Sequence, residues 1–278
     1  MKVAVITGAA SGIGLALSKL CLAKNWMVIM VDKDACGLHE AIESLTTEYA
    51  PQIKSYVCDI TQDQEVLKLA QYCQQHAPCI NWLFNNAGII GPIAPLWEIP
   101  HQSIQQVMDV NLHGMIRIIQ AFTPLLFSQS HTSRIINIAS LYGICSGSLV
   151  APYTMSKHAV LALSESLHYD LQRLNKPVEV SVAFPSFTAT ALLASDKKNH
   201  SALQEALSNL LTHSRPVMEV AEQIIRQIEQ NQFYIFPDKE VKGYCEERTK
   251  AMVEQTEPHT NNIEKLMRSL IRRSEKKQ

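Results

Sequence analysis

The stretch Thr7-Gly8-Ala9-Ala10-Ser11-Gly12-Ile13-Gly14 joins the first apolar run, Val3–Thr7, to the first helical pattern, Ile13–Lys24. Gly8 allows a sharp turn, Gly12 allows the backbone to approach a pyrophosphate, and Gly14 allows the helix to pack closely on the strand. The amide groups and the positive dipole end of the helix would then face the phosphates. This position between a strand and a helix predicts a dinucleotide site, and the alternative is a tight turn without a ligand. The residues of the predicted site are Gly8, Ser11, Gly12, Ile13 and Gly14.

Short apolar runs alternate with amphipathic helical patterns along the rest of the chain. The predicted strands are Val3–Thr7, Met27–Val31, Ile53–Cys58, Ile80–Phe84, Arg134–Ala139, Val178–Phe184 and Phe233–Phe236. The predicted helices are Ile13–Lys24, Ala35–Tyr49, Gln62–Gln75, His101–Phe127, Tyr153–Leu174 and Met218–Gln230. Strands this apolar are buried on both faces, which indicates a parallel sheet between layers of helices. The expected fold class is therefore α/β, a doubly wound parallel sheet with helices on both faces and a ligand crevice at the carboxyl ends of the strands.

The composition suits a globular protein, because the chain has 278 residues of which 46% are hydrophobic and 18% charged. The formal net charge of -1 gives no overall field that attracts nucleic acid or an anionic membrane. The seven cysteines are scattered without zinc-ligand spacing, which indicates free thiols in a reducing compartment and no metal site. A strand begins at Val3, and no apolar run approaches the ~20 residues that span a bilayer. We therefore expect a cytoplasmic protein without stable membrane insertion.

Two acidic residues follow predicted strands. Asp32 ends the second strand, where a carboxylate accepts hydrogen bonds from the adenosine ribose and repels a 2′-phosphate. The glycine turn offers no basic side chain, although Lys33 follows Asp32 directly, so the sequence favours NAD over NADP. Asp59 follows the third strand and is expected near the adenine; for Asp32 the alternative is a surface residue that ends a strand.

Tyr153 and Lys157 lie four residues apart in a helical pattern, so they share one face of the helix. A tyrosine with its usual pKa of ~10 is a poor proton donor or acceptor at neutral pH. A fixed ammonium beside it, helped by an oxidised nicotinamide, favours the phenolate. Ser140 follows the preceding strand and reaches the same rim of the sheet, where its hydroxyl can polarise a carbonyl that Tyr153 protonates.

Several motifs together give the chain a resemblance to the short-chain dehydrogenase/reductase family over about residues 2–240. The turn Thr7-Gly8-Ala9-Ala10-Ser11-Gly12-Ile13-Gly14 resembles the family's cofactor loop, and Asn85-Asn86-Ala87-Gly88 resembles its motif after the fourth strand. Asn111 in Asp109-Val110-Asn111-Leu112 resembles the family's helix asparagine, and Ser140, Tyr153 and Lys157 match the other catalytic positions. The resemblance implies a Rossmann fold with one dinucleotide-binding and catalytic domain over residues 1–240, followed by a helical extension over residues 241–278.

The resemblance also implies a role for each matched residue. Tyr153 is expected to be the general acid in reduction and the base in oxidation, and Ser140 to orient the substrate oxygen. Lys157 is expected to hold the nicotinamide ribose and lower the tyrosine pKa, while Asn111 anchors a water that relays protons. The expected cofactor contacts are Gly8, Ser11, Gly12, Ile13, Gly14, Asp32, Asp59, Ile60, Asn86, Ala87, Gly88, Tyr153, Lys157, Pro185, Thr188 and Thr190.

One position departs from the family pattern. Ser186 follows Pro185 where the family usually has glycine, so Ser186 is expected to be mildly strained if that backbone needs a positive φ. Its hydroxyl and the side chain of Phe187 are then expected to shape the substrate side instead. The other candidate wall residues are Ile90, Leu141 and Tyr142.

The segment at about residues 186–215 corresponds to a lid over the substrate crevice. Its leucines either close over an apolar alcohol or ketone or only pack the lid onto the body. In the tail, the residues Ile263, Leu266, Met267, Leu270 and Ile271 recur at helical spacing beside basic residues. This stripe is expected to pack on its own body or on a partner subunit, and a membrane surface is the alternative. The long helices His101–Phe127 and Tyr153–Leu174 resemble the surfaces through which the family pairs, which favours a homodimer or homotetramer.

These observations lead to three functional hypotheses. The leading one is an NAD-dependent alcohol dehydrogenase or ketone reductase that transfers a hydride between the nicotinamide cofactor and a carbonyl or secondary alcohol. An isomerase or dehydratase with a transient redox step is an alternative enzyme. A non-catalytic dinucleotide-sensing protein is the alternative from another class, and the presence of Tyr153, Lys157 and Ser140 disfavours it.

Overall fold

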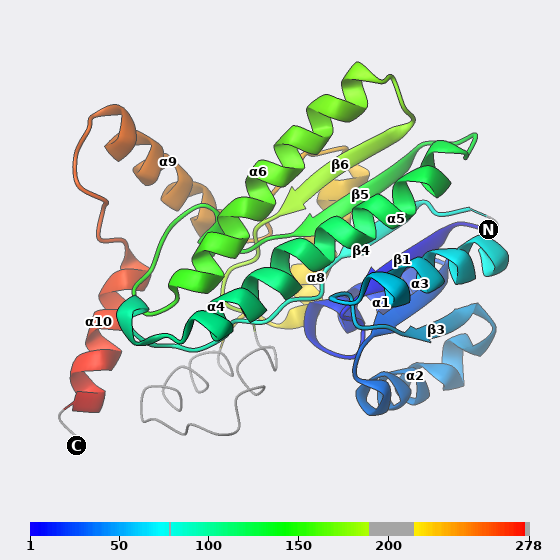
Figure 1. Ribbon diagram of the computed structural model, residues 1–278, viewed down its shortest axis with the longest axis horizontal. Coiled ribbons are helices and arrows are strands. Elements are labelled where there is room, and N and C mark those ends of the chain that lie inside the picture. Colours follow the sequence, from blue (N-terminus) through cyan, green and yellow to red (C-terminus); the bar gives the residue numbers. More distant parts are fainter. Residues whose placement is uncertain (78, 189–213, 276–278) are drawn as a thin grey trace.

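Seven strands among the described residues form one parallel sheet (Figure 1). The computed structural model describes residues 1–77, 79–188 and 214–275. The strands are β1 (Val3–Thr7), β2 (Met27–Asp32), β3 (Ile53–Val57), β4 (Trp82–Asn85), β5 (Ser133–Ile138), β6 (Val178–Ala183) and β7 (Tyr234–Ile235), in the order β3-β2-β1-β4-β5-β6-β7. The order reverses direction between β1 and β4, which opens a crevice at the carboxyl ends of these strands. The predicted doubly wound sheet is confirmed.

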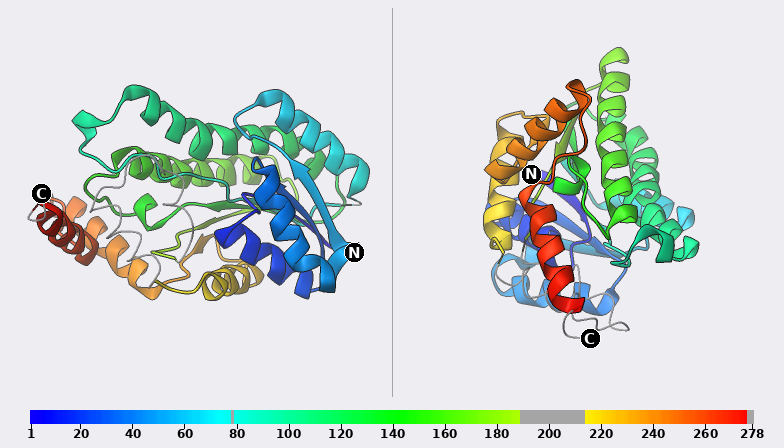
Figure 2. Two further views of the ribbon diagram at one scale, coloured as in Figure 1. Left: turned by 90° about the horizontal axis from the view of Figure 1, so that it is seen from below. Right: turned by 90° about the vertical axis from the view of Figure 1, so that its left-hand side faces the viewer.

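Helices cover both faces of the sheet, as the apolar strands require (Figure 2). One layer holds α1 (Gly12–Ala23), α2 (Ala35–Tyr49) and α8 (Val217–Glu229), and the other holds α3 (Asp63–His76), α5 (Met115–Phe127) and α6 (Ala151–Arg173). Alternate residues of β1 serve the two layers: Val3 and Val5 join one core, and Ala4 and Ile6 join the other. The right-hand view of Figure 2 shows α8 (yellow) and α6 (green) on opposite sides of the sheet.

The helix predicted over His101–Phe127 contains a change of helical type. It consists of α4 (His101–Met108), a π-helical segment over Asp109–Gly114, and α5. A π turn holds an extra residue, and the average apolar periodicity of a long helix does not reveal it. This segment carries Asn111, whose side chain bonds to the backbone of Ile89 outside the helix.

Two helices, α9 (Lys239–Val253) and α10 (Asn262–Glu275), follow the last strand. Figure 1 shows both at the end of the molecule opposite the N-terminus, beyond the carboxyl ends of β5 and β6. The division into a domain over residues 1–240 and an extension over residues 241–278 stays a prediction. Most of the predicted lid, including Thr190, lies outside the described residues. Across the described ranges, no helix combines the length and hydrophobicity needed to cross a bilayer. Single turns of 3-10 helix complete the described structure at Ala50–Gln52, Leu96–Glu98 and Leu141–Gly143.

Candidate active site

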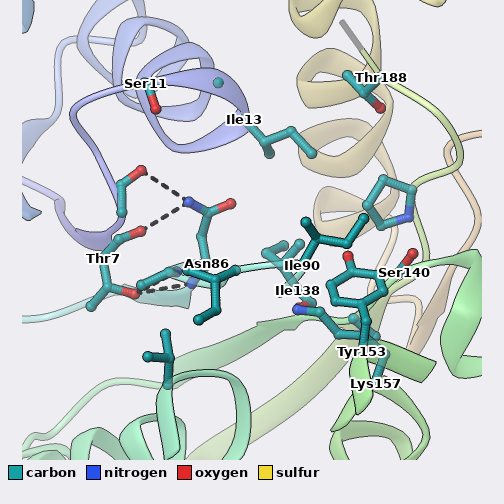
Figure 3. Close-up of a pocket in the computed structure, with 18 of the residues that line it drawn as sticks. Thr7, Ser11, Ile13, Asn86, Ile90, Ile138, Ser140, Tyr153, Lys157 and Thr188 are labelled. Carbon is teal, nitrogen blue, oxygen red and sulfur yellow. Dashed lines mark hydrogen bonds between the residues drawn. The ribbon is translucent and has the colours of Figure 1, made fainter. Parts of the chain in front are cut away.

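A cavity of about 390 Å³ lies at the carboxyl ends of the strands (Figure 3). Of the predicted site residues, the cavity lining includes Gly8, Ser11, Gly12, Ile13, Asp32, Asp59, Ile60, Asn86, Ala87, Gly88, Ser140, Tyr153, Lys157, Pro185 and Thr188. Gly14 and Asn111 do not line it, and Thr190 lies outside the described residues. Figure 3 shows Thr7 and Ser11 on one side of the cavity and Ser140 and Tyr153 on the other. The glycine turn and the Ser140–Tyr153 pair therefore lie at opposite ends of one cavity.

The glycine turn after β1 packs directly against the end of β4. Gly8 has φ +65, and a Cβ there would lie 2.9 Å from the Cα of Ala87. A Cβ on Gly14 would lie 2.1 Å from the carbonyl oxygen of Gly8, so Gly14 lets α1 pack closely and does not contact the cavity. The Asn86 side chain donates to the carbonyl oxygens of Thr7 and Gly8 at 2.9 and 3.1 Å (dashed in Figure 3). Asn86 thus fixes the turn that starts α1.

Thr7 is a site residue that was not among the predicted contacts. Its buried hydroxyl donates to the carbonyl oxygen of Phe84 at 3.2 Å and accepts from the amides of Asn86 and Ala87 at 3.0 and 3.2 Å. These bonds join the carboxyl ends of β1 and β4 across the crevice. The available sequence signal was a hydroxyl residue at the end of an otherwise apolar strand.

The first turn of α1 is placed to receive an anion. Ser11 precedes this helix with an extended backbone, and its side chain makes no capping hydrogen bond to the helix. The first amides of α1 therefore remain available beside the cavity, where the helix dipole favours negative charge. This arrangement fits the pyrophosphate of a dinucleotide.

Asp32 and Asp59 line the part of the cavity in which the adenosine of a dinucleotide is expected. One carboxylate oxygen of Asp32 accepts from the amide of Ala10 at 3.0 Å, and the other accepts from the amide of Asp34 at 3.1 Å. Each oxygen can accept a second hydrogen bond, so the carboxylate retains capacity for ribose hydroxyls. Asp59 uses one oxygen to hold the amide and hydroxyl of Thr61 at 2.9 and 2.8 Å, which fixes the turn before α3. Together with the turn at Gly8, these groups fit the adenosine end of a dinucleotide.

Three side chains form the opposite end of the cavity. Tyr153 lies in the first turn of α6 and is 7% exposed, and Lys157 lies one turn later and is 3% exposed. The Lys157 Nζ atom is 5.6 Å from the centre of the Tyr153 ring and donates to the carbonyl oxygen of Ile138 at 2.9 Å. The Ser140 hydroxyl lies at the same end of the cavity as the Tyr153 phenol and accepts from the amide of Tyr142 at 3.2 Å. The geometry therefore places two hydroxyl groups and one amine around a common space.

Burial controls the protonation of these groups. It raises the pKa of Tyr153 to about 12, and the nearby Ser140 hydroxyl opposes this rise. It also lowers the pKa of Lys157 to about 8. In the protein alone, burial thus has a larger effect on the Tyr153 pKa than the neighbouring amine, and the phenol is neutral at neutral pH.

Asn111 lies behind the cavity wall and is fully buried. Its side chain accepts from the amide of Ile89 and donates to the carbonyl oxygen of the same residue, both at 2.8 Å. It also donates to the hydroxyl of Ser156 at 3.0 Å. A Cβ on Gly88 would lie 3.2 Å from the Asn111 Oδ1 atom and 3.5 Å from the Lys157 Nζ atom, so both side chains approach Gly88 closely. Asn111 therefore positions the loop between β4 and Lys157.

The segment after β6 is tied to the start of α9. The backbone of Ser186 does not have a positive φ, so the strain considered for this position does not arise. Its amide donates to Asp238 and its hydroxyl donates to Glu240, both at 2.9 Å. Phe187 meets the Tyr142 ring edge to face, with ring centres 6.3 Å apart. Ser186 thus contacts α9 while Phe187 shapes the cavity.

The remaining lining residues are mainly apolar. The candidate wall residues Ile90, Leu141, Tyr142 and Phe187 all line the cavity. Val150 and Met267 line it as well, although the sequence did not single them out as wall residues. Neither has a local sequence signal, because their place in the wall depends on contacts between distant segments.

Comparisons with known proteins agree with this geometry. Residues 2–201 match the family model for short chain dehydrogenases. A 1-deoxy-11-beta-hydroxypentalenate dehydrogenase of Streptomyces exfoliatus is 37% identical over 193 residues, which cover 69% of this chain and 69% of that protein. A short chain dehydrogenase/reductase from Burkholderia phymatum, solved in complex with NAD, has a TM-score of 0.87 and 26% identity over 93% of this chain and 96% of that one.

A more distant structure contains the other nicotinamide cofactor. A short chain dehydrogenase from Burkholderia cenocepacia, in complex with NADP, shares the fold with a TM-score of 0.73 and 20% identity over 91% of this chain and 94% of that one. These similarities indicate NAD(P) as the cofactor and leave the choice between NAD and NADP open. The family model and the relatives show that the chain belongs to the short-chain dehydrogenase/reductase family of NAD(P)-dependent oxidoreductases.

Proposed function

We propose that this protein transfers a hydride between NAD and a ketone or secondary alcohol, with Tyr153 as the acid and base. The observation that carries the proposal is that the Ser140 hydroxyl and the buried Tyr153 phenol lie at the same end of the cavity. Two hydroxyl groups that face one space can both bond to one substrate oxygen. The relative from Streptomyces exfoliatus, named as a dehydrogenase of a hydroxylated compound, is consistent with this reaction class.

In the direction of reduction, the substrate carbonyl oxygen lies between Ser140 and Tyr153. The residues at the nucleotide end of the cavity would hold a nicotinamide dinucleotide, which would supply the hydride for the carbonyl carbon. As negative charge develops on the substrate oxygen, Ser140 stabilises it by a hydrogen bond and Tyr153 donates its phenolic proton. Burial supports this role, because a pKa raised to about 12 keeps Tyr153 in its proton-donating form at neutral pH.

In the direction of oxidation, Tyr153 first loses its proton, and its phenolate then accepts the proton of the alcohol. The Ser140 hydroxyl and the ammonium of Lys157 stabilise this phenolate before it accepts the proton. We further propose that Lys157 holds the nicotinamide ribose and that Asn111 supports Lys157 through Gly88 and the loop behind it. The close approach of Gly88 to both side chains supports this arrangement.

The preference for NAD is a separate part of the proposal. Asp32 faces the cavity at the end of β2, where its charge would attract ribose hydroxyls and repel a 2′-phosphate. The proposed contacts along the dinucleotide are the predicted set that lines the cavity, from Gly8 to Thr188. All seven cysteines are free thiols, which supports our proposal that the protein works in the reducing cytoplasm.

The test is oxidation of NADH and NADPH by the purified protein with a panel of ketones and aldehydes. Replacing Tyr153 by Phe removes the transferable proton and keeps the ring, so we expect turnover to fall by about 100-fold to 10,000-fold. NADH binding, measured by fluorescence, should persist in this variant. Tyr49→Phe is the control, because Tyr49 lies in α2 and does not line the cavity. Binding of NADH by the wild-type protein without any turnover would instead favour the dinucleotide-sensing alternative.

A further inference from the structure

The C-terminal helix α10 contributes a residue to the wall of the active-site cavity. Met267 lines the cavity and is only 2% exposed. It belongs to the same apolar core as Tyr142, Val150 and Tyr153. Within the described part of α9 and α10, Met267 is the one residue that lines the cavity. The tail of the chain is therefore part of the wall of the cavity that contains Tyr153.

Polar contacts hold α10 in this position. Asn261 caps the start of the helix by accepting from the amide of Glu264 at 2.8 Å. The Glu264 carboxylate accepts from the amide of Ser148 at 3.0 Å and from Arg268 at 3.0 Å. Ser148 lies in the segment between β5 and α6, which also carries Tyr142 and Val150. Glu264 therefore attaches α10 to the same segment that forms the apolar wall.

A second contact attaches the tail to this segment. Arg248 of α9 donates to the carbonyl oxygen of Ile144 at 2.9 Å. Both helices of the tail are thus bonded to backbone groups of the segment between Ser140 and Val150. The position of α10 is therefore fixed by specific hydrogen bonds as well as by the packing of its apolar side chains.

The chemistry around Met267 indicates what this end of the cavity accepts. Besides Met267, the apolar lining of the cavity includes the rings of Tyr142 and Phe187 and the side chains of Val150 and Ile93. Among the described lining residues, charged side chains occur only at Asp32, Lys33, Asp59 and Lys157. The first three lie at the nucleotide end, and Lys157 lies beside Tyr153. A substrate group extending away from Tyr153 toward Met267 would therefore meet apolar surface.

We propose that Met267 is a specificity-determining residue, the end wall that limits the length of an apolar substituent on the substrate carbonyl, and that Glu264 is its positioning residue. This inference rests on the proposed function and narrows its substrate class to ketones and alcohols with an uncharged hydrocarbon skeleton. A larger side chain at Met267 shortens the space, and a smaller one lengthens it. Loss of the hydrogen bond between Glu264 and the Ser148 amide would loosen α10, and with it Met267, without altering the residues that react.

The main experiment measures the length of methyl ketone that each variant prefers. Methyl ketones from butanone to undecanone are reduced with NADH by the wild-type protein and by Met267→Ala, Met267→Leu and Met267→Phe. We expect the preferred chain length to increase in the Ala variant and to decrease in the Phe variant, with kcat/KM ratios between long and short ketones changing about tenfold. Met267→Leu, which keeps the volume, and Lys265→Ala, which changes an exposed residue of α10, should match the wild type.

The positioning role of Glu264 has its own measurement. Glu264→Ala removes the acceptor for the Ser148 amide, so discrimination between long and short ketones should fall and KM should rise while kcat stays near the wild-type value. Glu264→Gln keeps an acceptor and should restore the discrimination. Limited proteolysis should cleave within α10 faster in Glu264→Ala than in Glu264→Gln.

Binding of the same ketones separates this inference from the proposed function. Ketone and NAD are both oxidised, so calorimetry of the complex with NAD reports binding without turnover. If the chain length of the ketone that binds best changes with the residue at position 267, but no variant shows catalysis, the proposed role of Met267 would stand and the proposed function would be refuted. If the Ala and Phe variants are both active and prefer ketones of the same chain length, the proposed role of Met267 would be refuted and the proposed function would stand. If the preferred ketone length changes only in mixed oligomers of two variants, the residue that limits the length would belong to α10 of a neighbouring subunit. This outcome would also refute the proposal, which assigns the limit to Met267 of the same chain.

Discussion

At the level of single residues, the site depends on two ionisable groups that burial shifts in opposite directions. The pKa of Tyr153 rises to about 12, and the pKa of Lys157 falls to about 8. Burial disfavours the charged form of each, so the phenol keeps its proton and the amine loses its proton more readily. Reduction needs a protonated tyrosine and gains from a charged lysine, and both conditions hold together only below about pH 8.

The pH dependence of reduction should therefore report Lys157. Lys157 is charged below its pKa of about 8 and neutral above it. Because its charge stabilises the developing Tyr153 phenolate, we expect kcat/KM for ketone reduction to be constant below about pH 8 and to fall above it, by at most about tenfold per pH unit. Tyr153 itself, with a pKa of about 12, should not limit this range.

The control for this profile is Lys157→Arg, since an arginine keeps its charge at all accessible pH values. This variant should be slower at every pH because its geometry differs, but it should lose the decline near pH 8. A wild-type profile that stays level up to about pH 10 would contradict the assignment to Lys157.

Asp32 is the residue that should set the cofactor preference. Asp32→Ala removes a charged acceptor of ribose hydroxyls and also the repulsion of a 2′-phosphate, so we expect KM for NADH to rise about tenfold or more and KM for NADPH to fall. The same carboxylate holds the amides of Ala10 and Asp34, so part of the effect could come from the turn. Asp32→Asn separates these contributions, because it removes the charge but keeps one acceptor oxygen. An unchanged ratio of the two KM values in both variants would refute this role.

At the level of helices and strands, local sequence patterns predicted most of the fold. Strands such as β1 are buried on both faces, which makes them continuous apolar runs that are easy to recognise. The edge strand β3 is partly exposed, and it ends at Val57 instead of Cys58 because its ladder with β2 ends there. Boundaries at edges depend on partner strands, and a single sequence does not show the partner.

The features that local patterns missed depend on contacts between distant segments. The π-helical segment places Asn111 against Ile89. The spacing of apolar residues around these two positions does not predict this contact. Most site residues were found because the family motifs encode their positions. Thr7 and Met267 were not predicted as site residues, since their roles arise from bonds to Phe84 and from the packing of α10 on the body.

At the level of the whole molecule, the central strands and the C-terminal tail contribute different parts of the site. The ends of β1, β4 and β5, with the start of α6, supply the residues of the proposed reaction, and α10 supplies part of the wall. A change in the tail can therefore alter the substrate space while the framework of the sheet remains. In the described tail, Met267 packs into the core of its own chain, which leaves other surfaces for association between subunits.

The exposed face of α6 is the surface on which we expect a homodimer or homotetramer to form. Met155 and Tyr169 lie two heptads apart on this helix and are 49% and 68% exposed, so they share one face. Burial of such apolar side chains stabilises association, whereas a buried unpaired charge opposes it. We therefore expect the double variant Met155→Glu, Tyr169→Glu to sediment as a smaller species than the wild type. Val253→Glu, at an exposed apolar residue of α9, and truncation after Glu257 should leave the sedimentation unchanged. A smaller species from the truncation, with the α6 variant unaffected, would assign the subunit interface to α10 instead.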